Sequence, residues 1–201
     1  MSVRIAWERR GEGQPLVLVH GLGYARWGWE PVADALAERF EVVLLDNRGI
    51  GESEAPAGPY TAAEMAEDVV RVLDEAGLER AHVVGTSLGG MIAQELALRT
   101  ERVERLVLVC TTPGGQSAVP MPEVTAKLIA EAASMEPLVA LRRFVENALA
   151  PGAPEELVER ILAHRLRTAQ PPTAWAAQAA AGVSFDAWDR LPELRAPTLV
   201  L

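Results

Sequence analysis

The sequence predicts an α/β fold, with a mostly parallel sheet and flanking helices. Short apolar runs alternate with helical patterns through the first half of the chain. Several runs lack polar alternation, which is typical of parallel strands that are covered on both faces. Strand–helix–strand alternation of this kind favours an α/β architecture. The predicted strands are residues 3–8, 15–20, 41–46, 81–85, 103–110 and 197–201.

The clearest helical pattern lies between the third and fourth predicted strands and reads "YTAAEMAEDVVRVLDEAG". Thr61 and Glu64 form a capping-box signature at its start. Gly77 is a suitable residue just beyond its end. One apolar stripe at helical spacing predicts the face that packs on the sheet; it consists of Met65, Val69, Val72, Leu73 and Ala76.

The serine-centred turn "GTSLGG" is the strongest chemical signal in the chain. Gly85, Ser87 and Gly89 match G-x-S-x-G, with a predicted strand before and a helix after. Such a turn projects the serine above the sheet in a strained conformation, and its neighbours must be tiny. The first amides of the helix favour a developing negative charge. A glycine-rich turn with an idle serine is the alternative.

A second glycine motif, "HGLG" at residues 20–23, follows the predicted strand 15–20. Acyl transfer needs two backbone N–H donors that face the tetrahedral oxyanion. One donor would be the amide of Leu88, directly after the serine. The other would be the amide of Leu22, because its glycine neighbours let the backbone come close. A simple turn at the end of a strand is the alternative.

Weaker candidates for substrate contact lie near this loop and in the helical region. Gly21 and Gly23 would allow close backbone approach. Tyr24 and Trp27 would wall an apolar acyl pocket, with ordinary core packing as the alternative. His164 lies on a predicted helix and could contact substrate, although a solvated or packing histidine is the more ordinary role.

The strand signals vanish from about residue 120, and alanine-rich helical patterns replace them. We predict a core over residues 1–119, a helical cap over 120–181 and a return to the core over 182–201. Ordinary packing helices are the alternative to a cap. The strand pattern resumes at "APTLVL", and we expect the C-terminal part of the core to be missing.

Composition excludes several classes of partner. The chain has 201 residues, enough for a well-buried core. Its 19 basic and 28 acidic side chains, with no basic run, argue against nucleic acid and anionic membranes. The single cysteine, Cys110, excludes an internal disulfide, and we expect a buried, inert thiol. No signal peptide and no membrane-spanning run is visible, so we expect a cytoplasmic protein; its oligomeric state stays open.

The motifs "HGLG", "DNRGIGES" and "GTSLGG", in this order, resemble the α/β-hydrolase fold family. The resemblance covers residues 15–115 and returns at 195–201. Within the family, the sequence is similar to 3-oxoadipate enol-lactonase-like esterases and lactonases, which carry a helical cap. The resemblance to the family implies that Ser87 is the nucleophile and that the amides of Leu22 and Leu88 form the oxyanion hole. In "DNRGIGES" we expect a structural loop beside the site, built by Asp46, Arg48 and Gly51.

Serine needs a base, usually a histidine oriented by a carboxylate. His20 more plausibly braces its own loop. His82 precedes Ser87 by five residues on one strand, which places it about 16 Å away. The family order of serine, acid and histidine places the acid after the strand that begins at 197. We therefore expect both base and acid to be absent from residues 1–201 of a fragment, or lost from a degenerate protein.

A serine at this turn points to acyl transfer, whereas the dehalogenases and epoxide hydrolases of this fold use an aspartate there. We predict a hydrolase of small carboxylic esters or lactones that works through an acyl-enzyme and needs no cofactor or metal. A C–C hydrolase or a perhydrolase with the same site is an alternative. A ligand-binding protein without catalysis is another. The substrate itself is not determined by the sequence.

Overall fold

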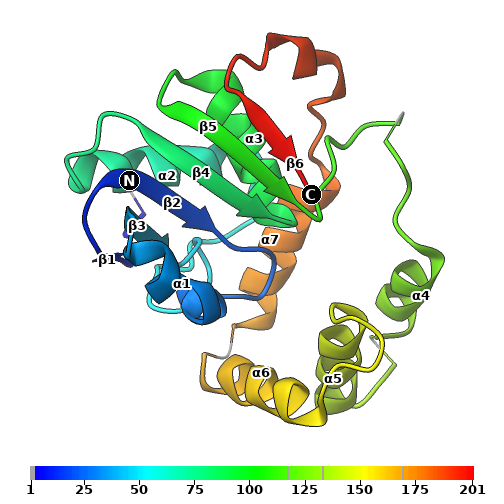
Figure 1. Cartoon of the computed structure of the whole chain (residues 1–201). Coiled ribbons are helices and arrows are strands. Elements are labelled where there is room, and N and C mark those ends of the chain that lie inside the picture. The colour runs from blue at the N-terminus through cyan, green and yellow to red at the C-terminus, as the bar shows by residue number, and fades with distance from the viewer. Residues whose placement is uncertain (1–2, 117, 133, 169) are drawn as a thin grey trace. The chain divides into compact units, whose positions relative to one another are not determined.

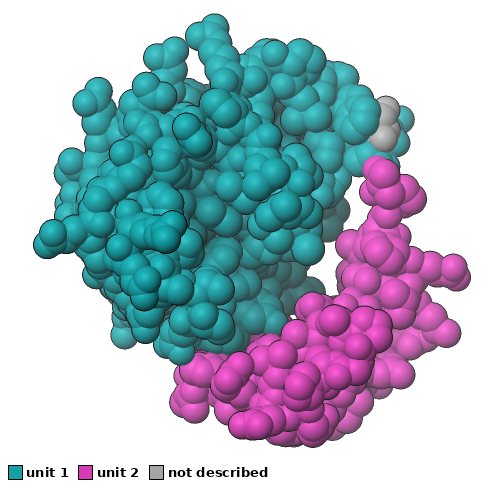
Figure 2. Space-filling view, viewed as in Figure 1, with its two compact units in different colours: residues 1–118, 170–201 teal, residues 119–169 magenta. Residues whose placement is uncertain are grey.

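The computed structural model describes residues 3–116, 118–132, 134–168 and 170–201. The chain forms two compact units, shown in Figure 2. Unit 1 consists of Met1–Ala118 and Gln170–Leu201, and unit 2 consists of Val119–Ala169. All strands of the main sheet lie in unit 1, which therefore carries the α/β core.

The sheet of unit 1 has six strands in the order β1-β3-β2-β4-β5-β6. Strand β1 runs antiparallel to β3, and the other pairs are parallel. The predicted fold class, a mostly parallel sheet with flanking helices, is confirmed. The strands are β1 (Trp7–Arg10), β2 (Gln14–Val19), β3 (Phe40–Leu45), β4 (Ala81–Thr86), β5 (Val103–Val109) and β6 (Thr198–Val200).

Helices cover both faces of this sheet because its strands are apolar on both sides. Helix α1 (Glu30–Ala37), which follows the short helix η1 (Arg26–Trp29), packs on one face around Leu16 and Leu18. Helices α2 (Ala62–Glu75) and α3 (Leu88–Arg99) pack on the other face, where the larger core cluster lies. The predicted capping box begins α2, since the Thr61 hydroxyl accepts the Glu64 amide at 3.2 Å.

The strand order creates a switch point between β2 and β4. The chain places β3 on one side of β2 and then returns to place β4 on the other side. The carboxyl ends of the parallel strands meet at one edge, as the arrowheads in Figure 1 show. Ligands of α/β sheets bind at this edge, at such a switch point. Both glycine motifs follow strands that end there.

Unit 2 is helical in its described residues. It contains α4 (Glu123–Ala132), α5 (Pro137–Asn147) and α6 (Glu155–Arg167), with a small core of its own around Val145, Val158 and Leu162. No described helix of the chain has the length and apolarity that crossing a membrane requires.

The compact units differ from the predicted domain boundaries at one end of the insertion. Helix α7 (Pro172–Val183) falls inside the predicted cap, 120–181, but belongs to unit 1. Its Ala177 and Ala181 are buried in the large core cluster. Alanine side chains are small enough to let this helix lie against the core of unit 1. The periodicity of the helix shows which face is apolar, but it does not show that this face packs on the core. The short helix η2 (Trp188–Glu193) then leads to β6.

Cys110 corrects one expectation, because its thiol is exposed and not buried. The residue directly follows β5 and has a φ of 48°. In β5, successive side chains point to opposite faces of the sheet. The left-handed backbone conformation of Cys110 ends this alternation, so the pattern does not predict where its side chain lies.

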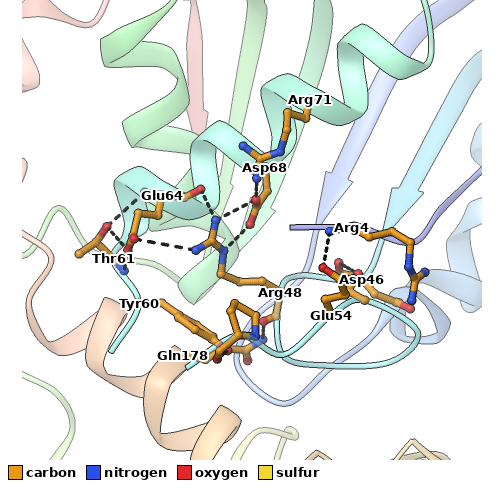
Figure 3. A network of polar contacts seen from close by, with 12 residues as sticks. Arg4, Asp46, Arg48, Glu54, Tyr60, Thr61, Glu64, Asp68, Arg71 and Gln178 are labelled. Carbon is orange, nitrogen blue, oxygen red and sulfur yellow. Dashed lines mark hydrogen bonds and ion pairs between the residues drawn. The ribbon is translucent and has the colours of Figure 1, made fainter. Parts of the chain in front are cut away.

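A buried ion pair ties the loop after β3 to the helices around it (Figure 3). Arg48 donates through Nε to Asp68 at 2.5 Å and through Nη2 at 2.9 Å. Arg71 also contacts this carboxylate, and Gln178 of α7 donates to the Arg48 carbonyl at 2.7 Å. Burial lowers the pKa of the Arg48 guanidinium from its usual value. The paired carboxylate offsets this cost of burial.

We expect Arg48→Met to lower the free energy of unfolding by about 3–5 kcal/mol, because Asp68 would lose its bidentate partner while staying buried. Urea unfolding of the whole chain measures the change. Arg195→Met is the matched control, because the Arg195–Glu101 pair is 88% and 89% exposed and should contribute nothing measurable. Equal changes in the free energy of unfolding for both variants would contradict the expected cost of breaking the buried pair.

Candidate active site

Ser87 lies in a strained turn between β4 and α3, at the carboxyl edge of the sheet. Its backbone has φ 53° and ψ −121°, which residues with side chains rarely adopt. Two hydrogen bonds to the Ser87 backbone hold this conformation: its amide donates to the Val109 carbonyl at 3.0 Å, and its carbonyl accepts from the Thr111 side-chain hydroxyl at 2.7 Å. The residue is exposed, and its side chain does not cap α3. The hydroxyl is therefore accessible at the helix start.

The glycines around Ser87 stand where a side chain has no room. A Cβ on Gly85 would lie 2.4 Å from the Gly89 carbonyl oxygen. A Cβ on Gly89 would lie 2.1 Å from the Val19 carbonyl oxygen of β2. The second glycine of the pair has a reason of its own, because a Cβ on Gly90 would meet Thr111 at 2.6 Å. Only glycine allows β2, β4 and α3 to approach this closely.

The "HGLG" loop lies directly beside the serine. A Cβ on Gly21 would be 3.0 Å from Ser87 Cβ and 3.5 Å from its Oγ. Leu22 follows Gly21, and Gly23, with φ 75°, turns the chain away. Leu88 is the first residue of α3, where amides lack acceptors within the helix. The fold thus brings Gly21, Ser87 and the peptide units that carry the Leu22 and Leu88 amides into one corner of unit 1.

Aromatic rings fill the space behind this loop. The His20 ring stacks on Tyr24 with 4.6 Å between centroids and lies 4.9 Å from Trp29. Trp27 contacts Tyr24 at 5.1 Å. A Cβ on Gly28 would lie 2.5 Å from His20 Nε2, so the imidazole is enclosed on that side. This packing agrees with His20 as a brace of the loop.

The other two histidines lie on elements other than the serine turn. His82 lies near the amino end of β4, with Nδ1 3.6 Å from Glu104, whereas Ser87 follows the carboxyl end. His164 lies on α6 of unit 2, where Nδ1 is 3.0 Å from Arg167. Among the described residues, no group of three or more His, Cys, Asp or Glu side chains is arranged to hold a metal ion.

The "DNRGIGES" loop is hydrogen-bonded to the segment that contains and follows the "HGLG" motif. Asp46 accepts the amides of Arg26 at 2.7 Å and Glu52 at 2.9 Å, and a Cβ on Gly51 would collide with its carboxylate. Sequence reasoning expected a structural loop here but overlooked Asn47, whose Nδ2 donates to the His20 carbonyl at 2.8 Å. The available signal was an amide side chain two residues after a buried strand, at the same edge as "HGLG".

The comparison with protein families identifies the class. The profile of the alpha/beta hydrolase fold matches residues 14–201, which is most of the chain. The chain belongs to the alpha/beta hydrolase fold family, as the order of its motifs suggested.

Solved structures of this fold match nearly the whole chain. A hydrolase from Pseudomonas aeruginosa PA01 is 31% identical with a TM-score of 0.84, and the match covers 98% of this chain and 75% of that one. The enol-lactonase from Burkholderia xenovorans LB400 is 29% identical with a TM-score of 0.82, over 98% of this chain and 77% of that one.

Among curated proteins, the putative carbamate hydrolase RutD of Azorhizobium caulinodans is 46% identical over 104 residues, 51% of this chain. The pimeloyl-[acyl-carrier protein] methyl ester esterase of Aeromonas hydrophila is 37% identical over 132 residues, 65% of this chain. These alignments span 39% and 50% of the two relatives.

We expect Gly89→Ala to destabilise the protein by at least about 2 kcal/mol, because the new methyl group would overlap the Val19 carbonyl. Gly182→Ala is the matched control, since a Cβ there meets its nearest atoms at 3.7 Å in ordinary contact. That control should be neutral or stabilising by up to about 1 kcal/mol, because alanine favours helices. Thermal unfolding of the two variants measures the difference. Similar midpoint temperatures would contradict the close approach of the Val19 carbonyl to Gly89.

Proposed function

We propose that Ser87 is the nucleophile of a serine hydrolase that acts on small carboxylic esters or lactones through an acyl-enzyme. One observation carries the proposal: an exposed serine in a strained turn, at the switch point of the sheet, in contact distance of the glycine loop. Strained backbone that the surrounding structure holds in place is a feature of functional sites.

In the proposed reaction, Ser87 Oγ attacks the carbonyl carbon of the substrate as a base takes the hydroxyl proton. The carbonyl oxygen gains negative charge and accepts hydrogen bonds from the amides of Leu22 and Leu88. Collapse of the intermediate expels the alcohol, which takes the proton from the base. Water then attacks the acyl-enzyme by the same route and releases the acid, and no step uses a cofactor.

The proposed reaction needs a base close to Ser87. His82 lies at the opposite edge of the sheet, and the His20 ring is stacked inside its own loop. His164 belongs to the other compact unit. In unit 1, neither described histidine lies where it could take the Ser87 proton, and we assign the base to no residue.

The substrate class rests on the chemistry of the site and on the relatives. Tyr24 and Trp27 are proposed to border the acyl group, and Gly21 and Gly23 to let it approach the backbone. Related proteins are named an enol-lactonase and a methyl ester esterase. A carbamate is a second candidate, because a relative 46% identical is named a putative carbamate hydrolase. A C–C hydrolase or perhydrolase would use the same nucleophile.

Labelling with a fluorophosphonate tests the nucleophile, because this reagent modifies activated serines. We expect a single tag on the peptide that contains Ser87, found by mass spectrometry after digestion. Ser87→Ala should abolish the tag. Ser184→Ala is the matched control and should keep it, because Ser184 is an exposed serine at the end of α7.

A tag on another serine, or no tag on a cooperatively folded protein, would contradict the proposal. Absence of the tag combined with tight retention of a small ester would favour the ligand-binding alternative.

A further inference from the structure

We propose that Asn47 is a positioning residue of the oxyanion hole, acting through the peptide bond between His20 and Gly21. The inference rests on the proposed function and goes beyond it, because Asn47 touches neither Ser87 nor the reacting atoms. Its side chain is 3% exposed, and Nδ2 donates to the His20 carbonyl at 2.8 Å. A carbonyl only accepts, so the amide nitrogen of Asn47 must face it.

The His20–Gly21 peptide is held at both ends. Asn47 binds its carbonyl oxygen, and its N–H donates to His20 Nδ1 at 2.7 Å. The ring that supplies Nδ1 is itself held by stacking on Tyr24. A planar peptide with both polar groups engaged cannot rotate about its flanking bonds without breaking a hydrogen bond.

The next peptide, Gly21–Leu22, carries the proposed oxyanion donor. Its carbonyl accepts from the Tyr24 amide at 3.3 Å, and in a trans peptide the Leu22 N–H points the opposite way. Gly21 joins the two peptides and lies against Ser87, but glycine has the softest backbone of any residue. The direction of the Leu22 N–H therefore depends on how firmly the preceding peptide is held, and the Asn47 side chain holds that peptide from another element.

Asn47 is able to act this way because its own loop is rigid. The Ile50 amide donates to the Asn47 carbonyl at 3.2 Å. The next residue, Arg48, is fixed by its two hydrogen bonds to Asp68, as Figure 3 shows. The "HGLG" loop is thus attached, through the Asn47 side chain, to the loop that carries the buried Arg48–Asp68 pair.

The competing explanation is that Asn47 merely stabilises the loop after β3. Gln178→Met separates the two explanations, since Gln178 is equally buried and donates to the neighbouring Arg48 carbonyl at 2.7 Å. Loss of either bond should cost similar stability, but only loss of the Asn47 bond should release the His20–Gly21 peptide.

The experiment compares wild type, Asn47→Leu, Asn47→Asp and Gln178→Met. Leucine and aspartate keep the size of asparagine but cannot donate at physiological pH. We expect hydrogen exchange of the Gly21 and Leu22 amides, followed by NMR, to accelerate about 10-fold or more in both Asn47 variants. Gln178→Met should leave these two amides unchanged. If the leucine variant does not fold, the aspartate variant decides.

With p-nitrophenyl acetate as the probe, both Asn47 variants should lower kcat about 10- to 100-fold at unchanged KM, because a displaced donor weakens only the transition state. Unchanged exchange at Gly21 and Leu22, or an equal loss of kcat in Gln178→Met, would overturn the role of Asn47. A wild type that does not turn over this ester would count against the proposed function, while the exchange measurement would still decide the role of Asn47.

Discussion

The close approach of β2, β4 and the start of α3 is the constraint on which the rest of this structure depends. At Gly89 the helix backbone nearly touches the carbonyl end of β2, and at Gly85 the strand nearly touches the helix. This crowding forces Ser87 into its strained conformation and also brings the "HGLG" loop against it. One steric feature therefore sets the positions of both the proposed nucleophile and its proposed oxyanion donors.

The strain needs a rigid surrounding, and the parallel sheet provides it. Strands β2 and β4 are adjacent, and their buried residues face helices on both sides. A residue in a disfavoured conformation costs of the order of 1–3 kcal/mol, which a well-packed core can bear. The buried pair of Arg48 and Asp68 adds little net stability of its own, since desolvation opposes its attraction. Its contribution is geometric, because it orients the loop after β3 toward α2.

Family membership alone does not define the reaction of this chain. The alpha/beta hydrolase fold supports many chemistries, and the relatives include proteins named esterase, lactonase, carbamate hydrolase and epoxide hydrolase. A serine at the turn favours acyl transfer among these, because a serine hydroxyl can form an acyl-enzyme. The helices of unit 2 have a small core of their own, so they form a unit with its own packing.

The sequence by itself determined the fold class, the serine turn and the glycine loop. These features are carried by local patterns: apolar runs that become strands, a capping box at Thr61, and glycines at fixed offsets from Ser87. Each depends on residues within a few positions of one another, where backbone sterics decide the outcome.

Only the tertiary structure decided how these parts meet. The contact of Gly21 with Ser87, the bond from Asn47 to His20 and the packing of α7 on the core join residues that are far apart in the chain. The exposure of Cys110 likewise followed from a backbone turn that apolar periodicity does not encode. The physical reason is that hydrogen-bond partners and close approaches are chosen by the packed arrangement of strands, and no single segment contains that information.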